Sequence, residues 1–187
     1  MDSDASLSNH FLIAMPDLAD PHFFHTVTYL GTHDDTGAQG LVINRPSQMT
    51  LADLFEHLDI TTTREELLEL PVYSGGPIQT EQGFILHSPE TSWQSTFRTS
   101  GALSLTASRD ILEAIAVGEG PQEFLIALGY AGWGPGQLEQ EMLENSWLTC
   151  AADENIIFHT PIDLRWNQAA KLVGIDLALL SHDAGHA

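Results

Sequence analysis

The apolar residues of this chain fall into short runs, each about as long as a β-strand and each followed by turn-forming residues. Residues 10–15 form the first run, which Pro16 ends. Residues 26–30 and 40–44 form the next two, with Asp-Asp-Thr-Gly between them. Because turn residues between two strand-like runs let the chain reverse its direction, we predict a β-hairpin over residues 26–44.

Further along the chain, strand-like runs alternate with stretches in which apolar residues have helical spacing. The additional strands are expected over residues 72–73, 83–87, 102–106, 124–130, 147–150 and 155–159. The helices are expected over residues 51–58, 64–70, 108–117, 137–144, 161–173 and 176–180. Hairpins mixed with strand–helix–strand passages favour an α+β fold with mixed or antiparallel sheets over a doubly wound parallel fold.

Local signals indicate where some of these elements begin. Thr50 and Asp53 have the spacing of a capping box at the start of a helix. Thr160 followed by Pro161 has the pattern of an N-cap and the first helical residue. Residues 129–136 are rich in glycine and are expected to form the turn between a strand and the next helix.

The length and continuity of the chain favour one domain over residues 1–187. A chain of 187 residues buries enough surface for a single hydrophobic core. No internal repeat, linker or low-complexity segment interrupts the sequence. The helical stretch at residues 46–71 is a candidate for a small insertion within that domain.

The charge of the chain is strongly acidic, with 26 acidic and 6 basic residues and a formal net charge of −20. Nucleic-acid binding needs clustered positive charge to displace the counterions of the phosphates, and no such cluster is present in the sequence. Binding to an anionic membrane surface is disfavoured for the same reason. We interpret the acidity as a source of solubility, with recruitment of a basic protein partner as the alternative.

The single cysteine, Cys150, excludes an intramolecular disulfide, which suits a reducing compartment. Residues 1–9 are polar and acidic and lack the features of a secretory signal. The apolar runs are too short to cross a membrane. We therefore expect a cytoplasmic protein, in which Cys150 is a small buried hydrophobic residue rather than a nucleophile.

Patterns that often mark active sites are incomplete in this sequence. The glycine-rich stretch at 129–136 lacks the Gly-Lys-Ser/Thr of a P-loop and the spacing of a dinucleotide-binding motif, so we interpret its glycines as architectural. Two histidine pairs have spacings that can chelate a metal, but neither belongs to a known zinc motif. These pairs are His22 with His25 and His182 with His186. We expect no metal and no cofactor.

Several longer motifs, taken in order, resemble the AlgH/YqgE family of bacterial proteins. They are HFLIAMP at 10–16, ADPHF at 19–23, TVTYL at 26–30, GLVINRP at 40–46, GGPI at 75–78, GFILH at 83–87, LGYAGWGPGQLEQEMLENSWLTC at 128–150 and AGHA at 184–187. The resemblance covers nearly the whole chain. It implies a compact α+β domain whose strands curl into a barrel-like or sandwiched core flanked by helices. The AlgH name reflects a regulatory association with alginate synthesis, and the family supplies no catalytic set to assign.

Two functions are compatible with these observations. The first is a non-enzymatic regulatory or binding protein, acting through an as yet undefined protein partner or small ligand. The alternative is an enzyme or a binder of a small anion, with a pocket where GLVINRP, GGPI and GYAGWGPGQ converge. Direct action as a transcription factor is disfavoured by the charge.

The candidate ligand-binding residues lie at strand ends or in the turns that follow them, where a scaffold usually presents functional groups. Arg45 lies where Pro46 is expected to end a strand, and its guanidinium suits a carboxylate or phosphate. Aromatic residues further along the chain would supply a flat wall. The full set is Asn44, Arg45, Gly75, Gly76, Tyr130, Trp133 and Gln137. The competing interpretation is architectural, with the glycines permitting sharp turns and the aromatic residues filling the core.

Overall fold

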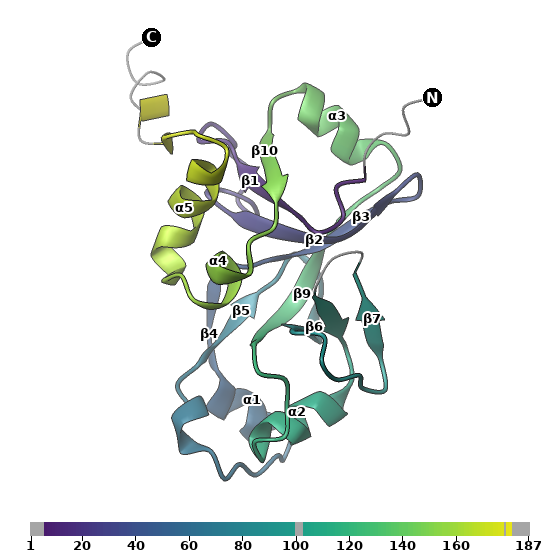
Figure 1. Cartoon of the computed structure of the whole chain (residues 1–187), viewed down its shortest axis with the longest axis vertical. Coiled ribbons are helices and arrows are strands. Elements are labelled where there is room, and N and C mark those ends of the chain that lie inside the picture. The colour runs from purple at the N-terminus through teal and green to yellow at the C-terminus, as the bar shows by residue number, and fades with distance from the viewer. Residues whose placement is uncertain (1–5, 100–102, 178, 181–187) are drawn as a thin grey trace.

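Strand β9 (Phe124–Trp133) lies at the centre of a curled β-sheet with helices around it (Figure 1). The computed structural model describes residues 6–99, 103–177 and 179–180. Strand β9 pairs antiparallel with β3 (Gly37–Val42) and β6 (Ile78–His87), and parallel with β5 (Pro71–Ser74). The sheet order is β10-β1-β2-β3-β9-β6-β8-β7, with β4 and β5 beside this path. The α+β fold with curled, mainly antiparallel strands is confirmed.

The other elements complete the sheet and cover it. The remaining strands are β1 (His10–Ala14), β2 (Val27–Asp34), β4 (Pro46–Thr50), β7 (Thr96–Arg98), β8 (Ser104–Thr106) and β10 (Trp147–Ala151). The α-helices are α1 (Leu51–His57), α2 (Arg109–Ala116), α3 (Gln137–Leu143), α4 (Glu154–Phe158) and α5 (Arg165–Leu172). Two 3-10 helices are η1 (Glu65–Leu67) and η2 (Ile162–Leu164). None of the helices in the described ranges is long and apolar enough to cross a membrane.

The predicted hairpin is confirmed as β2 and β3, which pair antiparallel from Thr28 with Val42 to Asp34 with Gly37. The predicted capping box is also confirmed at the start of α1. The Thr50 hydroxyl accepts a hydrogen bond from the Asp53 backbone N–H, and the Asp53 carboxylate accepts one from the Thr50 N–H. Local sequence signals therefore fixed these two features without help from distant parts of the chain.

Three apolar clusters hold the sheet and helices together. The first lies between the sheet and α4 and α5, and includes Phe11, Tyr29 and Ala169. The second lies beneath α1 and α2. The third packs around α3 and contains Trp133 and Trp147. The helices thus cover separate parts of one sheet rather than forming a layer of their own.

The prediction of a strand over residues 155–159 is wrong, because α4 occupies this stretch. The Asp153 carboxylate accepts hydrogen bonds from the N–H groups of Asn155 and Ile156 and so begins a helix. Thr160 does not act as the expected N-cap, since its hydroxyl donates to the Asn155 carbonyl. The predicted last long helix is divided into η2 and α5.

The predicted turn over residues 129–136 is also too long, because β9 continues to Trp133. Gly129 lies within the strand with a positive φ of 79°, and a Cβ there would lie 2.4 Å from the Gly76 carbonyl oxygen. This glycine is required by the close approach of another backbone segment rather than by a turn. Pro46, expected only to end a strand, is the first residue of β4.

Some sequence-based expectations concern residues or groupings that remain predictions. Residues 46–71 contain β4, α1 and η1, and β4 pairs with β5. Their interpretation as an insertion is still a hypothesis. The histidine pair at 182 and 186 and the closing motif lie outside the described residues, as does residue 178 of the short predicted helix. Within the described part of the chain, no group of three or more metal-ligating side chains occurs.

Candidate functional site

Asn44 and Arg45 hold the segment at residues 22–25 against the sheet. The Asn44 amide accepts from the Val27 N–H and donates to the His25 carbonyl, each at 2.9 Å. The Arg45 guanidinium donates to the carbonyls of His22, at 2.5 Å, and Phe24, at 3.1 Å. Burial lowers the pKa of Arg45, and the neighbouring Asp20 carboxylate opposes that effect. Both side chains therefore have a structural task at this position.

Gly75, Gly76 and Tyr130 lie together where the loop after β5 crosses β9. The Gly75 N–H donates to the Leu128 carbonyl at 2.8 Å. Gly76 has a φ of 154°, and a Cβ added to it would lie 2.1 Å from the carbonyl carbon of Tyr130. Only glycine permits this approach of two backbones, so the architectural interpretation explains both glycines.

Trp133 and Gln137 share one partner, the Glu141 carboxylate. Trp133 Nε1 donates to Glu141 Oε1 at 3.1 Å, and Gln137 Nε2 donates to Glu141 Oε2 at 2.9 Å. The Trp133 ring is buried, with its centroid 5.7 Å from that of Phe23. Since Arg45 binds the carbonyls on either side of Phe23, the groups of Arg45 and Trp133 both contact residues 22–24.

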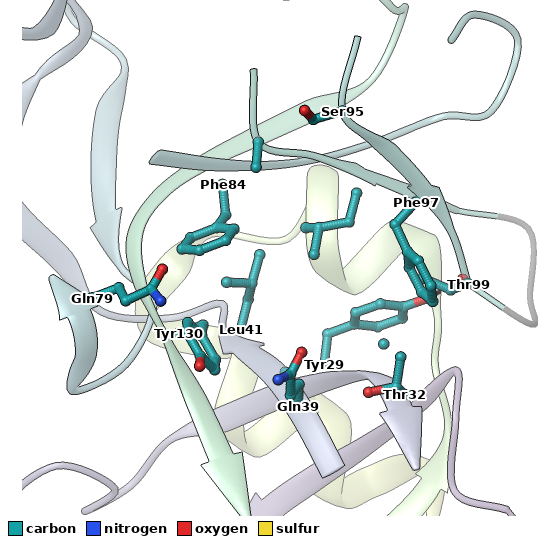
Figure 2. A pocket seen from close by; sticks show the side chains of 14 residues that line it. Tyr29, Thr32, Gln39, Leu41, Gln79, Phe84, Ser95, Phe97, Thr99 and Tyr130 are labelled. Atoms are coloured by element: carbon teal, nitrogen blue, oxygen red, sulfur yellow. Dashed lines mark hydrogen bonds between the residues drawn. The ribbon is translucent and has the colours of Figure 1, made fainter. Parts of the chain in front are cut away.

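The seven candidate residues thus occupy three neighbouring groups, and one of them, Tyr130, also lines a well-formed cavity. We call this the sheet cavity; its volume is about 390 Å³ (Figure 2). It is lined by Tyr29, Gly31, Thr32, Gln39, Gly40, Leu41, Gln79, Phe84, Ser95, Phe97, Thr99, Leu105, Ala107 and Tyr130. These residues come from strands β2, β3, β6, β7, β8 and β9 and the chain beside them.

Aromatic side chains form much of the wall of the sheet cavity. Phe84 and Tyr130 lie on one side in an edge-to-face arrangement, with ring centroids 5.5 Å apart (Figure 2). Phe97 lies on the opposite side, and its side chain is half exposed. Such rings provide large apolar surfaces that stack on flat ligands.

Polar groups at the sheet cavity are uncharged. In the described part of the chain, the side-chain amides of Gln39 and Gln79 form no hydrogen bond with the protein. Both side chains are exposed, so their donors and acceptors can meet a ligand. The Tyr29 hydroxyl is already held by Asn9 and Thr99, each at 2.9 Å. Burial raises the pKa of Tyr29, so this hydroxyl stays protonated at neutral pH. The cavity therefore offers neutral hydrogen-bonding groups beside apolar walls.

Gln79 reaches the sheet cavity because of an irregularity in β6. The pairing of β6 with β9 shifts register between Ile78 and Gly83. Gln79 itself has a positive φ of 49°, which is uncommon for a residue other than glycine. Unusual backbone conformations of this kind often place a side chain at a functional site.

A family model described as AlgH-like matches residues 11–178 of the chain. The chain belongs to the AlgH-like family. A UPF0301 protein of Thioalkalivibrio sulfidiphilus is 53% identical over 187 residues, covering 100% of both chains. Another, from Methylococcus capsulatus, is 54% identical over 187 residues with the same coverage. The family resemblance inferred from the motifs is confirmed.

Solved structures agree with this assignment. The solution structure of the AlgH protein from Pseudomonas aeruginosa superposes with a TM-score of 0.80 at 49% identity, covering 100% of this chain and 99% of that chain. The crystal structure of protein DIP2367 from Corynebacterium diphtheriae has a TM-score of 0.73 at 18% identity, covering 96% of this chain and 93% of that one. The second likeness concerns the fold alone.

Most residues of the sheet cavity were not among the sequence-based candidates. Of Gln39, Gln79, Phe84 and Phe97, only Phe84 lies in a strand predicted from the sequence. The pairing of distant strands brings the four residues together. The one local signal was the row of polar residues at 79–82 that precedes the apolar part of β6. That row predicts that the first half of the strand is exposed and the second half buried, but it does not predict which cavity the exposed half lines.

Proposed function

We propose that this chain is a non-enzymatic, regulatory binding protein of the cytoplasm whose sheet cavity takes an uncharged, flat, aromatic or heteroaromatic small molecule. The observation that carries the proposal is the combination of aromatic walls with the free amides of Gln39 and Gln79 in a cavity of about 390 Å³. Cavities of this size and mostly apolar character are typical of small-ligand sites.

The charge of the ligand follows from the lining. No Asp, Glu, Lys, Arg or His is among the 14 residues that form the wall. An anion would enter a protein of net charge −20 without meeting a cation. A cation would leave water without gaining a carboxylate. A neutral molecule avoids both costs, and the two amides supply donors and acceptors to its edge.

A regulatory role would arise from the elements that the ligand joins. Phe97 and Thr99 come from β7 and its end, at the edge of the sheet, whereas Tyr29 and Gln39 come from the β2–β3 hairpin. A ligand between them would stabilise the arrangement of the edge strand relative to the hairpin by mass action. An edge strand is a ready surface for a protein partner, so ligand occupancy would control partner binding.

The alternative proposal is anion binding or catalysis by the residues around Arg45, Gly76 and Trp133. It is supported by the shared contacts of Arg45 and Trp133 with residues 22–24. It is weakened as a ligand site by the hydrogen bonds that already occupy the Arg45 guanidinium. The variant Arg45→Gln therefore tests whether an anion binds near Arg45 rather than at another site of the protein.

The test is a titration of the labelled protein with indole, quinoline and adenine as neutral flat probes, followed by NMR. We expect at least one probe to shift the signals of Tyr130 and Phe84. The variant Gln79→Ala should weaken that binding about 3-fold to 10-fold, as expected for the net contribution of a hydrogen bond from an exposed amide. The matched variant Gln140→Ala, on α3 where Gln140 donates to Glu144, should bind normally.

Two results would contradict the proposal. One is preferential binding of charged analogues, such as benzoate or benzamidine, in the sheet cavity. The other is equal binding by the Gln79→Ala and Gln140→Ala variants, which would show that the free amide at the cavity has no part in recognition.

A further inference from the structure

A second cavity of about 410 Å³ lies between the start of β9, β5 and the chain from α4 to α5. We call it the arginine cleft, because Arg165, the first residue of α5, lines it and is only 5% exposed. Arg165 Nε donates to the Thr160 carbonyl at 2.9 Å, and Nη1 donates to the Ile43 carbonyl at 2.5 Å. Its guanidinium carbon lies 5.3 Å from the centroid of the Tyr73 ring.

The charge of Arg165 is not balanced by an acidic side chain. In the described part of the chain no carboxylate forms a salt bridge with it, although 26 acidic residues are available in the sequence. A buried cation without a counter-ion is costly, and proteins usually pair it. Its position in the first turn of a helix is also opposite to the preference set by the helix dipole. Helix stability therefore gives no reason for a cation at this position.

Hydrogen-bond donors remain available at the same place. Arg165 Nη2 has no hydrogen-bond acceptor within the described residues. It is also not fully enclosed, because it is absent from the set of completely buried polar atoms without a partner. The Tyr73 hydroxyl also has no hydrogen-bond partner within the described residues, and it is not fully enclosed by the protein. Both residues are more than nine-tenths buried and line the cleft. The free Nη2 can donate to one oxygen of a carboxylate and the Tyr73 hydroxyl to the other, while the charge of the guanidinium strengthens the first of these bonds.

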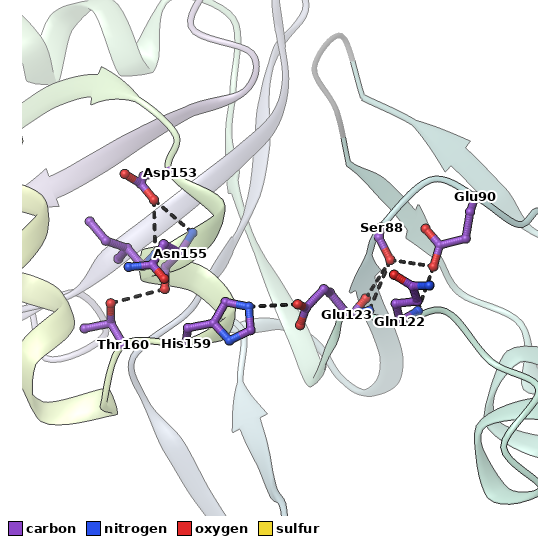
Figure 3. A network of polar contacts seen from close by, with 9 residues as sticks. Ser88, Glu90, Gln122, Glu123, Asp153, Asn155, His159 and Thr160 are labelled. Carbon is purple, nitrogen blue, oxygen red and sulfur yellow. Dashed lines mark hydrogen bonds and ion pairs between the residues drawn. The ribbon is translucent and has the colours of Figure 1, made fainter.

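The remaining wall of the arginine cleft is largely apolar. It includes Leu70, Phe124, Ile126, Phe158 and Ile162. A ligand of this site would thus have an apolar body and one anionic group. Glu123 contacts a residue of the cleft wall, since its carboxylate is 2.7 Å from Nε2 of His159 (Figure 3). This acidic neighbour disfavours the greater charge of a phosphate more than that of a single carboxylate.

We propose that the arginine cleft binds a small apolar monocarboxylate, with the carboxylate on Arg165 and Tyr73 and the apolar body among the residues of the wall. The site is separate from the sheet cavity, and its ligand differs in charge. Failure of one proposal therefore leaves the other standing.

The experiment is a titration of the full chain, followed by calorimetry and NMR, with sodium octanoate, octan-1-ol and inorganic phosphate as probes. We expect octanoate to bind at least about 10-fold more tightly than octan-1-ol, since charge-assisted hydrogen bonds distinguish them. Octanoate should shift the Arg165 Nε–H signal and the methyl signals of Ile162. Phosphate alone should bind more weakly than octanoate.

Variants separate binding from folding. Arg165→Gln is expected to lose the preference for octanoate over octan-1-ol, but it also removes bonds to two carbonyls and so threatens stability. Ile162→Glu provides the second test, because it places a carboxylate on the cleft wall and should abolish octanoate binding while Arg165 keeps its structural bonds. Arg45→Gln is the matched control, since Arg45 also holds two carbonyls yet does not line the cleft.

Specific outcomes overturn the proposal. Equal affinity for octanoate and octan-1-ol would show that Arg165 contributes no anion recognition. Octanoate shifts confined to Tyr130 and Phe84 would place the acid in the sheet cavity instead. Loss of binding in Arg45→Gln but not in Ile162→Glu would favour the region around Arg45. Stronger binding of phosphate than of octanoate would contradict the assignment of a carboxylate.

Discussion

The sheet cavity and the arginine cleft have nearly the same volume, about 390 and 410 Å³, but the lining of the first is uncharged and that of the second contains a cation. Strand β9 contributes residues to both cavities: Tyr130 lines the sheet cavity, and Phe124 and Ile126 line the arginine cleft. The difference arises from what the other elements bring. Strands β3 and β6 contribute neutral amides to one cavity, whereas α5 contributes a buried cation to the other.

This comparison shows how one central strand can serve two kinds of recognition. The register of β9 fixes where each cavity forms, because its partners on either side are set by backbone pairing. The chemistry is set by residues from distant segments of the chain. Substitutions that act on one cavity and leave the other unchanged are the sharpest test of this separation.

The largest effect is expected for Gly76→Ala, which should damage the sheet cavity and the whole sheet. The added Cβ would lie 2.1 Å from the Tyr130 carbonyl carbon, so the backbones must separate. We expect a loss of about 3 kcal/mol or more in the free energy of unfolding, measured with urea. The control is Gly136→Ala, where φ is 73° and no atom lies within 4 Å of the added Cβ. Its cost should be about 1–2 kcal/mol, and equal losses in both variants would contradict the close-approach argument.

Next in size is the difference between the two structural arginines. Arg165→Ala removes the donors that satisfy two carbonyls in a buried setting, so we expect a loss of about 3 kcal/mol. Arg45→Ala exposes its two loop carbonyls to water and should cost about 1 kcal/mol. Urea unfolding of both variants checks the order. A smaller loss for Arg165→Ala would mean that its bonds to the protein do little for stability and that its main purpose is the ligand.

The sequence predicted the parts of the fold that depend on local chemistry. The hairpin followed from turn residues between two strand-like runs, and the α1 capping box followed from the spacing of Thr50 and Asp53. The glycines of residues 129–136 were interpreted as architectural, whereas Gly75 and Gly76 of GGPI were candidates for a ligand site with an architectural alternative. Their actual task, the crossing of Gly76 and Gly129 against one another, depends on segments about fifty residues apart and is not encoded in any local pattern.

The candidate site was predictable only in part for the same reason. Tyr130 was identified from its position in a conspicuous motif, but Gln79 and Phe84 reach it through the pairing of β6 with β9. Arg165 gave no signal, because nothing local distinguishes a buried arginine at a helix start from an exposed one. Side chains that meet through long-range strand pairing need the register of the sheet before they can be grouped.

Acid should destabilise the fold through His87 more than through His25, because His87 is the more deeply buried of the two. His87 is fully buried on β6, and its Nδ1 donates to the Ser88 carbonyl while Nε2 accepts from Thr106. Burial lowers the pKa of His87 below its ordinary value of 6.5, with the Ser88 bond and Glu90 opposing this effect. Burial also lowers the pKa of His25, which stacks on Trp166 of α5 but is only partly covered.

The direction of the pH effect follows from these shifts. Because the folded pKa of each histidine is lower than the unfolded one, the unfolded chain binds more protons as the pH falls below about 6.5. Stability is therefore complete above that pH and declines below it, down to the folded pKa. Urea unfolding between pH 7.5 and 5 should show the decline, and His87→Gln should reduce its slope more than His25→Gln does. A slope unchanged in His87→Gln would assign the effect to other groups.

The smallest effect on ligand binding concerns α4, the helix predicted as a strand, and of the two cavities it involves only the arginine cleft. Asp153 accepts hydrogen bonds from the first N–H groups of α4, at 2.8 Å from Asn155 and 3.3 Å from Ile156. Asp153→Ala should cost about 1 kcal/mol of unfolding free energy, as for other N-caps. Because α4 supplies Phe158 to the cleft wall, the variant should also weaken octanoate binding slightly while leaving the neutral probes unaffected. Thr50→Ala, at the cap of α1, is the matched control, since α1 lines neither cavity. It should lose similar stability with no change in either ligand, and weakened octanoate binding in both variants would show that the cleft responds to global stability rather than to the position of α4.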